Sequence, residues 1–217
     1  MTATEGRRPI GLAPGAPEAA AGQDAKKYAT TNPVVVRLLD RWAASLRDLL
    51  NRGPLDGTIV DVGIGEGLAL ERVLGPDQAV IGVEYRHDKI LIATTRLSNL
   101  APLVGDAGML PLLDGSAHLV TSIEVLEHLT DPQAAVDEFA RICHPEGRVV
   151  VSVPWEPWFR LGNLGRGKNV ARIGNDPEHV QQFSPTRLRR LLATRFDTVE
   201  VNRAFPWLIA SAAGPRP

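Results

Sequence analysis

The 217-residue sequence contains one cysteine, few aromatic residues and almost no net charge. A single cysteine excludes an intrachain disulfide, and because Cys143 lies in an apolar helical pattern we expect a buried thiol. A formal net charge of −1 gives no bulk attraction to nucleic acid or to an anionic membrane. No apolar run approaches the roughly 20 residues that cross a bilayer, and the first residues lack the layout of a signal peptide. We therefore expect a cytoplasmic protein with no membrane span and no nucleic-acid partner.

Composition divides the chain into a tail and one domain. Residues 1–25 are rich in alanine, glycine and proline and show no periodicity. Such a segment buries too little apolar surface to offset its ordering entropy, so we expect a disordered tail. Residues 26–217 are long enough for one domain with a full hydrophobic core. Within them, residues 154–183 carry tryptophans and cations without a clean period, which indicates an insert.

Strand-like and helix-like segments alternate along this domain. Asn32 and Pro33 are typical of a helix start, and Gly53-Pro54 is typical of a stop. β-Branched or apolar runs predict strands at residues 59–62, 79–83, 100–104, 119–123, 148–153, 198–201 and 205–209. Helical patterns predict helices at residues 68–74, 86–97, 132–143 and 185–192. The alternation predicts an α/β fold, a doubly wound, mostly parallel sheet with helices on both faces.

A glycine-rich turn follows the first predicted strand. The turn contains glycines at alternate positions, Gly63, Gly65 and Gly67. Dinucleotide sites usually show G-x-G-x-x-G and hold a pyrophosphate, whereas here the third glycine comes one residue early. Asp61 and Glu66 place negative charge in or beside the turn, which suits a cationic ligand better than a phosphate. These features also count against a nicotinamide-dependent reductase.

The pattern Asp61-x-Gly63-x-Gly65-x-Gly67 resembles the first motif of the class I S-adenosylmethionine-dependent methyltransferases. Further motifs of that family appear in order near the ends of the next predicted strands: Glu84, Gly105-Asp106-Ala107, the segment 122–129 and the segment 145–154. The resemblance covers residues 28–210. It implies a Rossmann-like sheet of seven strands with the last one antiparallel.

The same resemblance implies a role for each matching residue. Asp61 and the glycines Gly63, Gly65 and Gly67 would hold the cofactor S-adenosylmethionine. Glu84 would accept hydrogen bonds from both ribose hydroxyls, since a carboxylate can accept two. Asp106 and Ala107 would receive the adenine, and Glu124 would lie near the methyl end.

Two histidines are candidates for the catalytic base. Methyl transfer to oxygen requires alignment of the acceptor and removal of its proton, and histidine titrates near neutral pH. His128 follows the fourth predicted strand, and His179 precedes the final helix. We therefore expect His128 or His179 to take the proton of a hydroxyl or phenol acceptor.

A divalent metal is an alternative role for the same region. Glu124, Glu127, His128 and His179 resemble the metal-binding arrangement of the ubiquinone-pathway O-methyltransferases and the small-RNA 2′-O-methyltransferases. Carboxylates and imidazoles could bind a divalent cation that lowers the pKa of an acceptor hydroxyl. The Glu-Val-Leu-Glu-His sequence also occurs in methyltransferases with no known metal, where it lines the pocket or caps a helix. Both interpretations stay open.

The acceptor is expected to be a small molecule. In this family the segment after the fifth strand usually forms the substrate wall, so residues 154–183 would face the substrate. Its apolar and cationic side chains suit a natural product, a quinone or phenol, or a lipid-like compound: Trp155, Trp158, Phe159, Arg160, Arg166, Lys168 and Arg172. Methylation of nitrogen or carbon, methylation of RNA, and non-catalytic cofactor binding are the alternatives. The sequence does not decide between a monomer and a homodimer.

Overall fold

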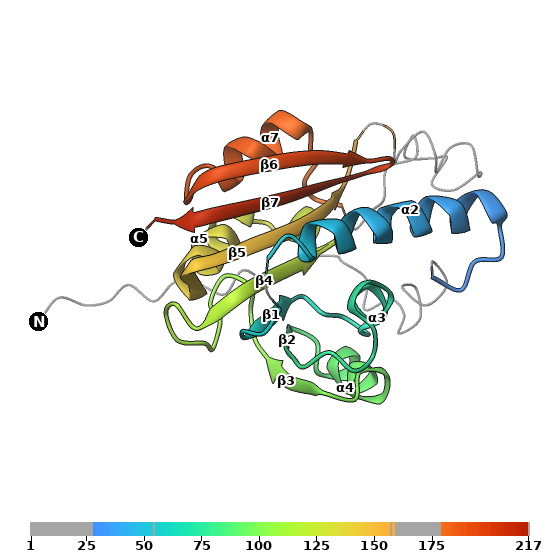
Figure 1. Cartoon of the computed structure of the whole chain (residues 1–217), viewed down its shortest axis with the longest axis horizontal. Helices are drawn as coiled ribbons and strands as arrows, with labels where there is room; N and C mark the ends of the chain where they lie inside the picture. Colours follow the sequence, from blue (N-terminus) through green and yellow to red (C-terminus); the bar gives the residue numbers. More distant parts are fainter. Residues whose placement is uncertain (1–27, 54, 157, 159–178, 217) are drawn as a thin grey trace, which may run out of the picture.

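The computed structural model describes residues 28–53, 55–156, 158 and 179–216 (Figure 1). The expected tail and most of the expected insert lie outside these residues. The described part forms a seven-stranded sheet in the order β3-β2-β1-β4-β5-β7-β6. The strands are β1 (Ile59–Val62), β2 (Val80–Glu84), β3 (Leu100–Val104), β4 (Ala117–Ile123), β5 (Cys143–Pro154), β6 (Phe196–Ala204) and β7 (Trp207–Pro215).

The sheet is parallel except for its last strand. β1 pairs in parallel with β2 on one side and with β4 on the other, so Val60 lies between Ile81 and Val120. β7 runs antiparallel to both of its neighbours, β5 and β6. The predicted topology, with an antiparallel last strand, is confirmed.

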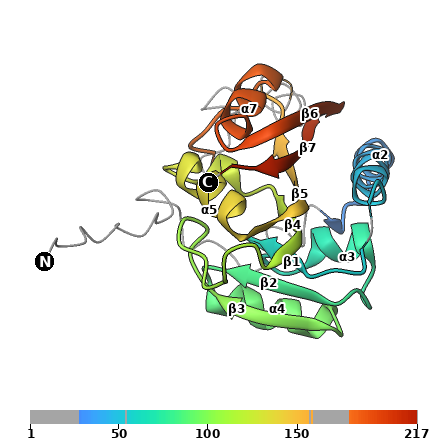
Figure 2. The same ribbon diagram turned by 60° about the vertical axis from the view of Figure 1, so that its left-hand side comes forward.

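Helices cover both faces of the sheet (Figure 2). One face carries α2 (Pro33–Leu50), α3 (Leu68–Leu74) and α4 (His87–Arg96), whereas the other carries α5 (Pro132–Ile142) and α7 (Pro185–Leu192). Caps fix the helix starts, because Asn32 accepts from two backbone N–H groups of α2 and Asp131 accepts from two of α5. Each of these two helices has proline at its first position.

Each face of the sheet has its own apolar core. Val149 and Val151 of β5 face the cluster under α5 and α7, and Val150 between them faces the cluster under α2, α3 and α4. Trp42 of α2 is fully buried in the latter cluster, where its Nε1 donates to Ser152 Oγ at 2.9 Å. This two-sided burial explains why the central strands are almost continuously apolar.

Three local predictions differ from the structure. Cys143 was expected in a helix, but it is the first residue of β5, where it pairs with Ala117; its predicted burial is confirmed. The pairing of β4 with β5 then shifts and resumes at Leu119 and Arg148, so the turn expected at residues 145–147 lies within an irregular part of the strand. β6 and β7 are also longer than the predicted strands 198–201 and 205–209, and residues 205 and 206 form the turn between them. Within the described ranges, no helix combines the length and hydropathy needed to cross a membrane.

Candidate functional site

The glycine turn lies at the carboxyl end of the central strand β1. Gly63, Gly65 and Gly67 all have positive φ angles, of 78°, 57° and 79°. Residues with a Cβ rarely adopt this left-handed region, so the turn requires glycine at each position. A Cβ on Gly63 would also come within 2.3 Å of a methyl carbon of Val125. The turn therefore brings backbone amides to the sheet edge at which open α/β sheets bind ligands.

Glu84 ends β2 beside this turn. Its Oε2 accepts from the backbone N–H of Gly65 and its Oε1 accepts from that of Arg86, both at 2.9 Å. These bonds fix the carboxylate and leave each oxygen with further acceptor capacity. A diol could bind to it in this orientation.

Asp61 lies under the turn and is buried in the sheet. Thr121 of β4 donates its hydroxyl to Asp61 Oδ1 at 2.5 Å. Burial raises the pKa of Asp61 to about 7, the Thr121 hydrogen bond opposes this effect, and the nearby Glu84 raises the pKa further. A cation at the turn would favour the charged form of Asp61.

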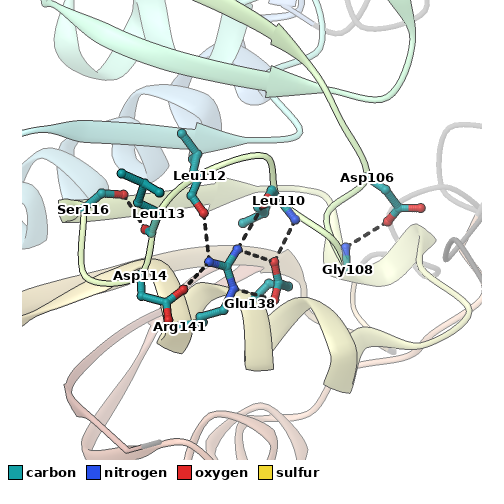
Figure 3. A network of polar contacts seen from close by, with 9 residues as sticks. All are labelled: Asp106, Gly108, Leu110, Leu112, Leu113, Asp114, Ser116, Glu138 and Arg141. Atoms are coloured by element: carbon teal, nitrogen blue, oxygen red, sulfur yellow. Dashed lines mark hydrogen bonds and ion pairs between the residues drawn. The ribbon is translucent and has the colours of Figure 1, made fainter. Parts of the chain in front are cut away.

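Asp106 follows β3 and shows an incomplete set of hydrogen bonds. Its Oδ1 accepts from the backbone N–H of Gly108 at 2.8 Å (Figure 3). Its Oδ2 is buried and has no hydrogen-bond partner within the part of the chain that the structure describes. A buried carboxylate oxygen without a donor is costly, so this atom is suited to accept from a ligand N–H such as the adenine amino group.

Glu124 follows β4 in a strained backbone conformation. Its φ angle is 58°, the one positive value at a non-glycine residue in the described ranges. The carboxylate accepts from Trp207 Nε1 at 2.8 Å and from the Tyr28 hydroxyl at 3.3 Å. These contacts tie the end of β4 to β7 and to the residues before α2.

A second group of acids and imidazoles lies just beyond Glu124. One ligand atom each of Glu127, His128 and His179 lies within 4.8 Å of the others, and the two imidazole rings are 5.3 Å apart. Glu127 is 1% exposed. Glu156, after β5, places its Oε1 3.6 Å from Nδ1 of His179. We name these four residues the acid–imidazole cluster.

The structure brings together three of the four residues expected to bind a metal. Glu127, His128 and His179 meet, whereas the carboxylate of Glu124 is held by Tyr28 and Trp207. Glu156 was not expected as a site residue. Its position two residues after a strand end, like that of Asp106, was the available signal.

Three aromatic side chains meet near the carboxyl end of β5. Trp155 contacts Trp158 with ring centroids 6.2 Å apart, and Trp158 contacts Phe205 at 5.9 Å. The guanidinium of Arg203 lies 5.1 Å from the centre of the Trp155 ring. The expected substrate-wall residues Phe159, Arg160, Arg166, Lys168 and Arg172 lie outside the described residues. Among the described rings, Trp158 and Phe205 are exposed, and Trp158 meets both Trp155 and Phe205 edge-on.

Comparisons with known proteins agree with this geometry. Residues 60–151 match the family described as "Methyltransferase domain". A demethylmenaquinone methyltransferase of Beutenbergia cavernae is 29% identical over 63% of this chain and 59% of that protein. A probable S-adenosylmethionine-dependent methyltransferase of Mycolicibacterium smegmatis is 28% identical over 65% of this chain and 52% of that protein. The chain thus spans about half of the length of these curated relatives.

A solved structure from Thermotoga maritima, described as an S-adenosylmethionine-dependent methyltransferase and possible histamine N-methyltransferase, has the same fold. It superposes with a TM-score of 0.63 at 20% identity, covering 82% of this chain and 91% of that chain.

Proposed function

The chain carries a class I S-adenosylmethionine-dependent methyltransferase domain, and we propose that the protein methylates a hydroxyl oxygen of a small-molecule acceptor. The observation that carries the choice of a hydroxyl is the acid–imidazole cluster. It places two potential bases, His128 and His179, beside buried carboxylates just beyond Glu124. An acceptor that must lose a proton needs such a base.

The residues at the strand ends fit the cofactor. The buried Oδ2 of Asp106 supports adenine recognition, and Ala107 follows it in the same turn. Glu84 would accept the ribose hydroxyls, and the turn of Gly63, Gly65 and Gly67 would carry the amino-acid part above Asp61. When bound, S-adenosylmethionine supplies a methyl group on a sulfonium sulfur, which is already an activated leaving group.

His179 is the better supported of the two bases. The carboxylate of Glu156 faces its Nδ1, so a proton on Nδ1 would be stabilised and Nε2 would remain an acceptor. An acceptor hydroxyl at Nε2 would then lose its proton as the new bond forms. Glu124, just before this cluster in the chain, is held in one orientation by Tyr28 and Trp207.

A metal-assisted form of the reaction has its own supporting observation. Glu127, His128 and His179 offer the carboxylate and imidazole ligands that bind a divalent cation, and the cation would lower the pKa of an acceptor hydroxyl. Chelation followed by dialysis tests this form. Activity that is lost with the chelator and returns with Mg²⁺, Mn²⁺ or Zn²⁺ would support it, whereas unchanged turnover would leave the imidazole as a metal-free base.

The surface beside the cluster favours an aromatic or lipid-like acceptor. The rings of Trp155, Trp158 and Phe205 supply apolar contact surface, and Arg203 adds a cation. The relative named demethylmenaquinone methyltransferase makes quinones a class to test first.

The experiment is a radiolabelled methyl-transfer screen over phenols, quinones, polyketides, lipids, sugars, amines and small RNA. We expect label on oxygen of a small molecule, and replacement of the base (His179→Gln) should lower kcat by about 10²–10⁴-fold. His128→Gln, which removes the other candidate base, is the matched variant for comparison with His179→Gln. Label on nitrogen, on carbon or on RNA would refute the acceptor assignment. Binding of S-adenosylhomocysteine with no transfer to any class would support a non-catalytic binding protein instead.

A further inference from the structure

The loop between β3 and β4 carries the proposed adenine site. We name residues 105–116 the adenine loop. Asp106 and Ala107 lie at its start, and in the described structure it contains no helix and only the isolated bridge between Asp106 and Met109. A loop of this kind must be held by contacts outside itself if Asp106 is to keep one orientation.

Two residues of α5, Glu138 and Arg141, hold this loop (Figure 3). Glu138 Oε2 accepts from the backbone N–H of Leu110 at 2.7 Å. Arg141 donates to the carbonyl of Leu110 at 3.0 Å, to that of Leu112 at 2.8 Å, and to the carboxylate of Asp114 at 2.6 Å. The loop backbone is thus hydrogen-bonded at several successive points to one helix.

The Glu138–Arg141 pair is itself fixed. Arg141 donates through Nε to Oε1 of Glu138 at 2.8 Å and through a terminal nitrogen to Oε2 at 2.7 Å. This bidentate pair is one turn apart on the helix, and the Glu138 side chain is only 10% exposed. The hydrogen bond to Glu138 is the largest cause that raises the pKa of Arg141. Arg141 therefore keeps its positive charge around neutral pH.

A short turn links Leu110, which this pair holds, to Asp106. The backbone N–H of Gly108 donates to Asp106 Oδ1, and that of Met109 donates to the Asp106 carbonyl at 3.0 Å. The next residue, Leu110, is buried and is the one held by both Glu138 and Arg141. Displacement of Leu110 would move the N–H groups that orient the Asp106 carboxylate.

We infer that Glu138 and Arg141 are positioning residues for adenine recognition, acting through Leu110 on Asp106. They lie on α5 and are outside the strand-end motifs of the domain. The inference rests on the proposed cofactor role of Asp106. It predicts that the pair sets the ability of the site to distinguish a purine 6-amino group from a 6-oxo group.

Calorimetry with two ligands tests this inference on the full chain. S-Adenosylhomocysteine presents the amino donor, whereas S-inosylhomocysteine presents a carbonyl oxygen to Asp106. In the unmodified protein, we expect the amino ligand to bind at least about tenfold more tightly, because the lost hydrogen bond is to a charged group. Glu138→Gln and Arg141→Lys should each reduce this ratio to below about threefold.

Asp137→Asn is the matched control. Asp137 is the neighbour of Glu138 on α5 and pairs at 2.9 Å with Arg195, away from the adenine loop. This variant should keep the full ratio. Circular dichroism and urea titration establish which variants fold, and Arg141→Lys decides the outcome if Glu138→Gln does not fold.

The possible failures are distinguishable. No binding of either ligand to the unmodified protein would refute the proposed cofactor. A ratio near one in the unmodified protein would refute the role of Asp106 and the inference with it. Equal weakening of both ligands by Glu138→Gln and Arg141→Lys, with the ratio intact, would show a purely structural pair and overturn the inference alone.

Discussion

Asp61 should make the stability of the protein decrease as the pH rises from about 4 to about 7. Burial is the main reason that its folded-state pKa is about 7, against an ordinary value of 3.8. Between these values the folded protein keeps the proton that the unfolded chain has lost. The stabilisation from the protonated carboxyl is therefore complete below the unfolded pKa and is lost as the pH approaches 7.

The magnitude follows from the size of the shift. The two pKa values differ by about three units, and each unit corresponds to about 1.36 kcal/mol, so the full effect is about 4 kcal/mol. Asp61→Asn removes the titration and keeps an oxygen to accept from Thr121. The variant should match the unmodified protein near pH 4 and exceed its free energy of unfolding by about 3–4 kcal/mol at pH 8.

Urea titrations followed by tryptophan fluorescence at several pH values would measure this difference. Asp88→Asn is the control, because Arg86 lowers the pKa of the exposed Asp88, so its contribution to stability is lost at low pH instead. Parallel pH profiles for the unmodified protein and Asp61→Asn would refute this expectation, since they would mean that Asp61 has the same pKa in the folded and unfolded states.

Three further perturbations have defined outcomes. Gly63→Ala should lower the free energy of unfolding by at least about 1–3 kcal/mol, because φ is 78° at this position and the new Cβ would overlap Val125. In urea titrations, adding Val125→Ala should restore only the part of this loss that comes from the overlap. Cys143 should resist thiol reagents until urea unfolds the chain, because burial raises its pKa to about 11, and rapid labelling of the native protein would contradict this. Trp42→Phe should cost about 1–3 kcal/mol in thermal or urea unfolding by leaving Ser152 Oγ without its donor, and an unchanged midpoint would show that this bond is dispensable.

The fold was predictable because its signals are local. Asn32 and Pro33 start α2 where the sequence indicates, and the glycine turn separates β1 from α3. Alternation of strands and helices then leaves few topologies, since parallel crossovers are right-handed. The expected doubly covered sheet follows from these features.

The extents of the last strands were not predictable in the same way. β7 continues through residues 211–214, Ser-Ala-Ala-Gly, which have low intrinsic strand propensity. Ser211, Ala212 and Ala213 are extended because they pair with β5 on one side and with β6 on the other. Cys143 was likewise placed in β5 by its pairing with Ala117 and not by its own helical pattern.

The residues of the candidate site also differ in how far local sequence patterns predict their contacts. Asp61 is the last but one residue of β1, Glu84 ends β2 and Asp106 follows β3, so their meeting at one sheet edge follows from the order of the strands alone. The contact of Glu124 with Trp207 joins residues 83 positions apart, and no local pattern signals it. The proposed cofactor residues were therefore expected together from the sequence, whereas the contacts of Glu124 needed the structure.

The position of His179 depends on backbone contacts that no motif encodes. The N–H groups of Val180 and Gln181 both donate to the carbonyl of Glu127 at 2.9 Å. They attach the segment before α7 to the segment after β4, and this attachment brings His179 against His128. Both bonds join backbone atoms alone, so they do not depend directly on the side chains of the acid–imidazole cluster. If the proposed acceptor binds at this cluster, side chains on this backbone frame would select it, and no local sequence pattern reports their arrangement.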